Sequence, residues 1–186
     1  MKSYKLIELN QTYNNNGFGY KAGIRGDFSA KGVNAVFPSE DLPESDSVII
    51  LNDIPFTFPS KEENVKNNFE LNNQEIKIPL KKYDKIHFLC AADTGSFLEK
   101  IKIGNDAEEY EIRAGFTNWT EIEPSFSEKI AIRTHKGYSG NKELDVNLTI
   151  WHQSINISKY NLIDSIRFRD NPSVHIFSIT LEHSGS

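Results

Sequence analysis

Short runs of alternating apolar and polar residues, broken by turn-forming residues, dominate this 186-residue sequence. Side chains on a strand point alternately to the two faces of a sheet, whereas a helix needs apolar residues every three or four positions. Almost no segment has the helical spacing. The pattern therefore predicts strands over Lys5–Leu9, Ser47–Leu51, Glu75–Ile78, Lys85–Ala91, Glu99–Ile103, Tyr110–Ala114, Lys129–His135, Leu144–Trp151, Ile163–Phe168 and Val174–Leu181.

This many strands cannot form one open sheet in a chain of this length without exposing an apolar face. The sequence therefore predicts an all-β fold, a two-sheet antiparallel β-sandwich of jelly-roll type, with residues 1–186 forming one domain. Apolar residues point to both faces of Val174–Leu181, so we expect this strand to lie centrally in its sheet. The loops within Asn14–Gly32 are expected to lie over the sandwich or across a binding cleft.

The charge balance argues against two classes of partner. A net charge of −5 and a pI near 5.6 provide no basic surface for nucleic acid or for an anionic membrane. No apolar run reaches the roughly 18 residues of a membrane span, and Met1–Lys5 lacks the apolar region of a secretory signal. We expect a soluble, cytoplasmic protein, or a secreted one if the sequence was trimmed from a longer precursor. The oligomeric state is left open.

Metal and cofactor chemistry has little support in the sequence. The five histidines lack the spacing of a zinc site, and no dinucleotide, P-loop, hydrolase or dithiol motif occurs. Cys90 lies in the apolar run Ile86–Ala92 and is predicted to be a buried core residue. We expect no cofactor and no metal, with a structural calcium ion near Asp27, Glu40 and Asp41 as the one alternative.

Several segments, taken in order, resemble a known class of module. They are Tyr13–Gly17, Gly26–Phe28, Phe37–Pro43, Ile54–Pro59, Glu63–Val65, Gln74–Ile76, His87–Gly95 and Val174–Leu181. In these segments the chain is similar to the galactose-binding-like β-sandwich modules found beside glycoside hydrolases such as α-L-fucosidase-like enzymes. The resemblance implies a carbohydrate-binding module. The chain departs from the family pattern at Glu63, Asn73 and Cys90, and we expect no catalytic domain beside it.

Sugar-binding modules stack an aromatic ring on the sugar while amides and charged groups bind its hydroxyls. The loop carrying Asn118 and Trp119 offers an indole beside an amide, and the turn carrying Tyr138 and Asn141 offers a phenol and an amide. We expect these four residues, together with Arg133 and His135, to bind a carbohydrate or another sugar-containing small molecule.

Two other interpretations stay open. His87, Arg133, His135 and His152 can supply acid–base groups if strands bring them together, as in a lyase, an epimerase or a cyclase. Alternatively, the domain binds a protein partner through an exposed sheet edge. The sequence favours non-catalytic ligand binding over both.

Overall fold

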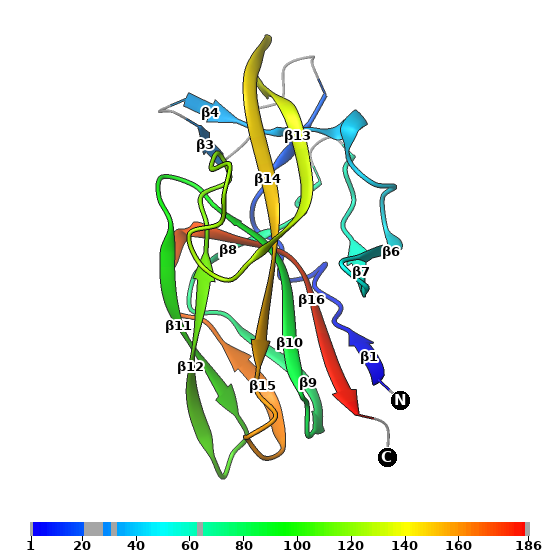
Figure 1. The fold of residues 1–186 in the computed structure, drawn as a ribbon, viewed down its shortest axis with the longest axis vertical. Helices are drawn as coiled ribbons and strands as arrows, with labels where there is room; N and C mark the ends of the chain where they lie inside the picture. The colour runs from blue at the N-terminus through cyan, green and yellow to red at the C-terminus, as the bar shows by residue number, and fades with distance from the viewer. Residues whose placement is uncertain (1, 21–27, 31–32, 63–64, 185–186) are drawn as a thin grey trace.

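A computed structural model describes residues 2–20, 28–30, 33–62 and 65–184. The regular elements in these residues are β-strands and one short 3-10 helix, η1 (Ser39–Asp41). Figure 1 shows the strands in two main sheets, as the alternating pattern predicts. No helix in the described ranges is long and apolar enough to cross a membrane.

The larger sheet has six strands, and all of its pairs are antiparallel. Its order is β1-β16-β10-β14-β13, and β8 also pairs with β16. The final strand therefore lies centrally, which confirms the prediction from its two apolar faces. The bounds are β1 (Lys2–Leu6), β8 (Phe69–Leu71), β10 (Lys85–Ala92), β13 (Lys129–Ser139), β14 (Lys142–Asn156) and β16 (Asn171–Ser184).

The smaller sheet is also antiparallel, with the order β12-β11-β15-β9. Its strands are β9 (Glu75–Lys81), β11 (Phe97–Gly104), β12 (Glu109–Phe116) and β15 (Ile163–Arg167). Three two-stranded units complete the described strands: β2 (Phe18–Gly19) with β5 (Phe37–Pro38), β3 (Phe28–Ala30) with β4 (Val33–Ala35), and β6 (Ser47–Leu51) with β7 (Ile54–Phe58).

The two main sheets enclose an apolar core. Phe88 on β10 and Ile179 on β16 belong to the same buried cluster as Ile101 on β11 and Ile166 on β15. Strand residues two apart share a face, so one side of each strand supplies this core. Cys90 belongs to the same cluster and is fully buried, as predicted, and burial raises the pKa of its thiol.

The opposite face of the six-stranded sheet is also buried. Phe177 of β16 packs there against Phe18, with ring centroids 5.3 Å apart, and Phe37 packs edge-on against Trp119 at 5.0 Å. Segments from the first third of the chain supply most of this cover, which confirms that they lie over the sandwich. Residues 21–27 and 31–32 of the expected covering loops lie outside the described residues.

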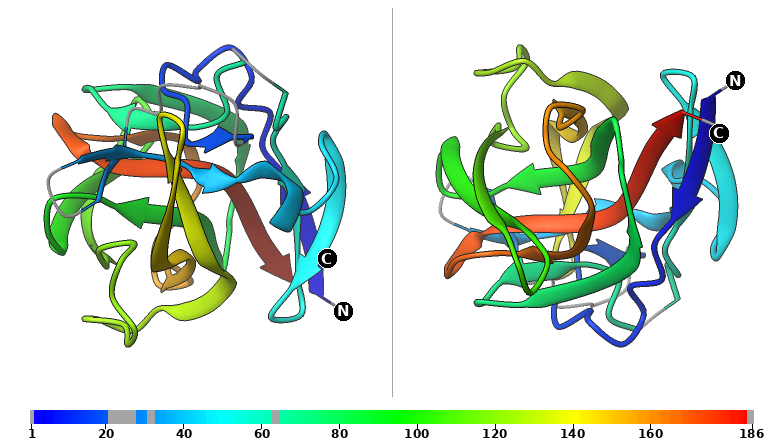
Figure 2. Two further views of the ribbon diagram at one scale, coloured as in Figure 1. Left: turned by 90° about the horizontal axis from the view of Figure 1, so that it is seen from above. Right: turned by 90° about the horizontal axis from the view of Figure 1, so that it is seen from below.

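The β6–β7 hairpin covers one end of this second face. Its two-residue turn, Asn52 and Asp53, has φ angles of 51° and 66°. Both values are left-handed, as the common two-residue hairpin turn requires, and Asn and Asp tolerate them better than most residues. Thr180 Oγ1 donates to Pro55 O at 2.7 Å, and Asn52 Nδ2 donates to Ile130 O at 3.1 Å. Figure 2 shows the hairpin (cyan) lying beside β1 and β16.

Truncating the second core should destabilise the whole domain. We expect Phe177→Ala to lower the free energy of unfolding by about 3–5 kcal/mol, because it leaves a cavity among stacked rings. Leu80→Ala, at a side chain that is 59% exposed, should change it by less than about 0.5 kcal/mol. Urea denaturation measures both, and equal effects would contradict a packed second core.

Candidate functional site

Three ionisable side chains lie buried on the face that the β6–β7 hairpin covers. On β14, Leu148 and Ile150 point into the second core, so His152 points to the same side at the end of this row. His87 on β10 and Glu182 on β16 occupy neighbouring positions on adjacent strands. Their exposed fractions are 2–4%, which is unusual for ionisable residues and makes them candidates for a functional site.

These side chains form a continuous row across three strands. His87 Nδ1 lies 3.0 Å from His152 Nε2, within hydrogen-bond distance, and His87 Nε2 lies 3.5 Å from Glu182 Oε2. At its other end the row reaches the surface, where Lys2 Nζ lies 3.2 Å from Glu182 Oε1. The row therefore joins a surface ammonium group to a buried imidazole.

The carboxylate sets the tautomer of each histidine. A negative charge favours hydrogen on the nearer nitrogen, His87 Nε2, which leaves a lone pair on His87 Nδ1. His152 Nε2 must then donate to that lone pair, so His152 Nδ1 is itself an acceptor. This nitrogen and His87 Nε2 are both shielded from solvent, and neither has a hydrogen-bond partner among the described residues. A buried unpaired polar atom costs about 1–3 kcal/mol, so these two nitrogens lower the stability of the fold.

Both imidazoles are neutral near pH 7. Burial lowers the pKa of His87 to about 4, and the carboxylate of Glu182 opposes part of that shift. Burial lowers the pKa of His152 to about 4, and the electrostatic influence of His87 and the positive charge of Lys129 add to that shift. The row therefore presents a neutral hydrogen-bonding surface and not a cationic one.

A cavity of about 380 Å³ adjoins the row, and we name it the histidine pocket. This volume lies within the range of small-molecule sites. Hydroxyl, amide, carboxylate and ammonium groups dominate its wall, which is formed by Lys2, Tyr4, Asn52, Asp53, Ile54, Lys85, His87, Ser127, Lys129, His152, Ser154 and Glu182. The turn of the β6–β7 hairpin thus supplies part of the pocket.

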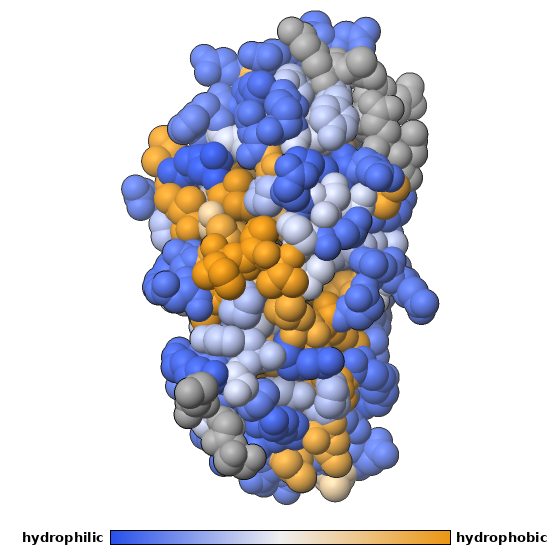
Figure 3. Space-filling view, turned by 90° about the vertical axis from the view of Figure 1, so that its right-hand side faces the viewer, coloured by the Kyte–Doolittle hydropathy of each residue, from blue (hydrophilic) through white to orange (hydrophobic). Residues whose placement is uncertain are grey.

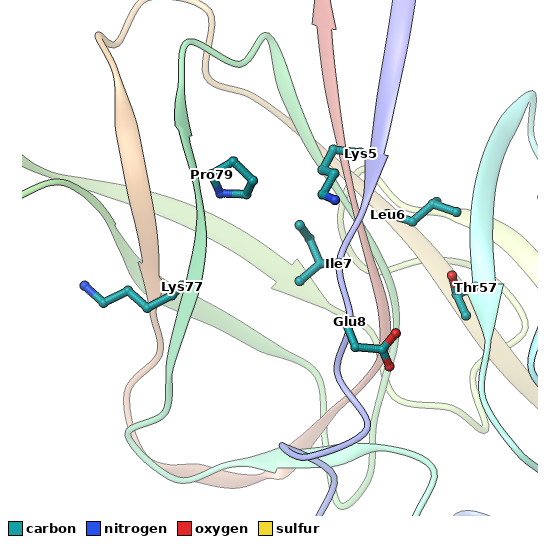
Figure 4. Close-up of a pocket in the computed structure, with 7 residues that line it drawn as sticks. All are labelled: Lys5, Leu6, Ile7, Glu8, Thr57, Lys77 and Pro79. Carbon is teal, nitrogen blue, oxygen red and sulfur yellow. The ribbon is translucent and has the colours of Figure 1, made fainter.

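Two other hollows on the surface do not bring buried polar side chains together in this way. A groove of about 370 Å³ lies beside the edge strand β9, and Figure 4 shows its seven lining residues spread apart, with Lys77 pointing away from the rest. A neighbouring hollow of about 500 Å³ shares Glu8 and Lys77 with it. No buried histidine or carboxylate among the described residues lines either one, so we place the candidate site at the histidine pocket.

The structure brings together only two of the four predicted acid–base residues. His87 and His152 form the row, but Arg133 and His135 lie across the sheet from it. Arg133 Nε donates to Thr149 Oγ1 at 2.9 Å, and His135 Nδ1 lies 2.8 Å from Asn147 Oδ1. Residues 147 and 149 alternate with His152 along β14 and therefore point to the opposite face. Arg133 also donates to the carbonyl of Ile122 and so anchors a loop.

The predicted ligand-binding residues lie apart from one another, and most are buried or already hydrogen-bonded within the fold. Trp119 is fully buried in the second core, so its indole is not presented to a ligand. Asn118 Oδ1 accepts hydrogen bonds from Thr120 within its own loop. Tyr138 is 4% exposed and its hydroxyl donates to Glu40, while Asn141 is exposed at the turn of the β13–β14 hairpin. The fold does not gather these residues into one pocket.

The acidic residues considered for calcium face a lysine. Lys136 Nζ lies 2.8 Å from Glu40 Oε1 and 3.9 Å from Asp41 Oδ2. Asp27 lies outside the described residues. Within the described ranges no group of three or more His, Cys, Asp or Glu side chains is placed to hold a metal ion.

Sequence reasoning missed most of the pocket. Glu182 follows the predicted final strand by one residue, and nothing local marks it as buried beside His87. Lys2, Asn52, Asp53 and Lys129 were not singled out either, because they come from three separate parts of the chain: β1, the β6–β7 turn and β13. The one usable signal is that β10 and β16 are apolar strands that each contain an ionisable residue.

Comparison with known families agrees with this architecture. A family model described as the AziU2-like beta-sandwich domain matches residues 3–185. The chain belongs to this family. None of the curated proteins was found to match the sequence. The resemblance of this AziU2-like domain to modules beside glycoside hydrolases stays a prediction, as does the carbohydrate ligand that it implies.

One face of this AziU2-like domain also carries an apolar patch. Val48 and Ile50 on β6 are 60% and 65% exposed, and Ile130 on β13 is 42% exposed. Figure 3 shows apolar residues gathered across the middle of the side that β6 and β7 occupy. Single exposed apolar residues need no explanation, but a contiguous patch is the type of surface that partner binding would use.

Acidification should destabilise the domain through the histidine row. Each histidine binds a proton near pH 6.5 when unfolded but only near pH 4 when folded, so stability falls as pH drops between these values. The fall should be at most about 1.4 kcal/mol per pH unit per histidine. Urea denaturation at about pH 6.5 and 5 should show a smaller fall in His152→Gln than in the wild type.

The control is His135→Gln, which removes an exposed histidine from the same sheet. Its pH dependence should match that of the wild type. If His152→Gln and His135→Gln lose stability equally on acidification, the neutral buried row is refuted.

Proposed function

We propose that this domain binds a carbohydrate or another sugar-containing small molecule in the histidine pocket. The observation that carries the proposal is the row of buried ionisable side chains that adjoins a cavity of about 380 Å³ with polar walls. Burying three ionisable groups costs stability that apolar residues would not cost. A binding role accounts for that cost.

The chemistry of the wall fits a ligand with many hydroxyls. Ser127 and Ser154 offer hydroxyl groups that both donate and accept, Asn52 offers an amide, and Asp53 offers a carboxylate. The row adds the neutral imidazole of His152, which also lines the pocket. A sugar ring carries alternating hydroxyls that match this mixture of donors and acceptors.

Tyr4 adds an aromatic side chain to the same wall. Aromatic rings in sugar sites pack against the apolar face of a pyranose while polar groups bind its edge. Tyr4 therefore takes the role that the sequence assigned to Trp119, whose indole is buried.

A bulky residue in the pocket should abolish binding without disturbing the fold. Ser154 is exposed at the pocket wall, and Ser154→Tyr should weaken the binding of a sugar found on a glycan array at least about tenfold. Ser158→Tyr makes the same change at an exposed position outside the pocket and should leave the affinity unchanged. Calorimetric titration measures both.

Amide chemical shifts map where the sugar binds. Shifts that gather at Asp53, Ser127 and Ser154 support the histidine pocket. Shifts at Asn118, Tyr138 or Asn141 would move the site to the loops predicted from the sequence. Absence of binding to every glycan on the array would refute the carbohydrate-binding role.

The row also favours a second candidate, an acid–base enzyme such as an epimerase or a lyase. The imidazole of His152 lines the pocket and is neutral, so it can act as the base that removes the proton from a carbon next to a sugar carboxylate. The electron pair moves onto the carboxylate, where a lysine ammonium stabilises it, and the imidazolium returns a proton to the same carbon. Removal and return of this proton exchanges it with solvent hydrogen and consumes no other reactant.

Solvent deuterium tests this candidate. In heavy water, an active enzyme should exchange the hydrogen next to the carboxylate of glucuronate, galacturonate or mannuronate, as seen by NMR of the sugar. His152→Gln should lower the rate by about 100-fold or more, while His135→Gln should not. Binding without any exchange would exclude the catalytic role and retain the binding one.

A further inference from the structure

The histidine pocket is positively charged although the chain as a whole is acidic. Three lysines and two carboxylates contribute to its wall, whereas the complete sequence has a net charge of −5. Glu182 is already neutralised by Lys2, whose ammonium lies 3.2 Å away. Lys85 and Lys129 then outnumber the remaining carboxylate, Asp53.

Lys85 and Lys129 lie on both sides of the buried row. Lys85 is on β10, two residues before His87, and so points to the same face of the sheet. Lys129 on β13 is directly opposite His152 on β14. Neither ammonium group has a carboxylate within ion-pair distance in the described part of the chain. Their charges also oppose protonation of the two histidines, so the same field favours an anion.

We propose that the ligand of the histidine pocket is an anionic sugar, whose carboxylate or phosphate lies against Lys85 and Lys129 while its hydroxyls face the histidine row. This inference rests on the proposed function and specifies its ligand class. Two lysines without carboxylate partners give the pocket a positively charged edge, and this edge favours a ligand with an anionic group over a neutral one.

Matched sugar pairs test the inference by calorimetric titration. The probes are glucose with glucuronate and glucose 6-phosphate, galactose with galacturonate, and mannose with mannuronate. We expect at least one anionic sugar to bind about fivefold or more tightly than its neutral partner at low salt, and the advantage to shrink at high salt. The carboxylate and phosphate arms show which anionic group is preferred.

Charge variants assign the effect to these lysines. The double variant Lys85→Gln/Lys129→Gln should remove most of the advantage of the anionic sugar over its neutral partner. Lys142→Gln is the matched control, because it removes an exposed lysine outside the pocket. Melting temperatures should be similar in all variants, since none removes an ion pair or a core contact.

The outcomes separate the inference from the function on which it rests. If neutral and anionic sugars bind equally, or the double variant keeps the full anionic advantage, the inference is overturned and the binding function stands. If no sugar of either kind binds, both fail. An anionic advantage that Lys142→Gln removes as well would assign the effect to net charge and overturn the proposed role of the pocket lysines.

Discussion

The six-stranded sheet is buried on both faces, and the rest of the structure depends on this constraint. One face packs on the smaller sheet, and the other packs on rings such as Phe18, Phe37 and Trp119. A strand buried on both sides presents apolar residues to both faces, as β16 does with Ile176 and Phe177. An ionisable residue on these strands is therefore buried unless the apolar cover ends beside it.

The histidine pocket lies at such an end. The second core extends along β14 through Leu148 and Ile150, and His152 follows at the margin of the β6–β7 hairpin. Because these strands belong to a two-sided core, the backbone that carries the row is held rigidly. A site on rigid strands keeps its polar groups in fixed positions, which lowers the entropic cost of ordering them around a ligand.

The neutral state of the histidines gives this arrangement its chemical character. Two imidazoles in water would be partly protonated just below neutral pH, but burial keeps His87 and His152 uncharged. The positive charge beside the row comes from lysines nearer the surface. The pocket thus separates a neutral hydrogen-bonding surface from a cationic edge, and a ligand with hydroxyls at one end and an anionic group at the other matches both.

The sequence by itself determined the fold class, the central place of the final strand and the burial of Cys90, because period-two alternation and local apolar runs are properties of neighbouring residues. It could not determine the site. Arg133 lies on a predicted strand and His152 directly follows one, and only the pairing register shows that they point to opposite faces. Glu182 lies beside His87 because strands distant in sequence became neighbours, and strand order is a tertiary property that no local pattern encodes.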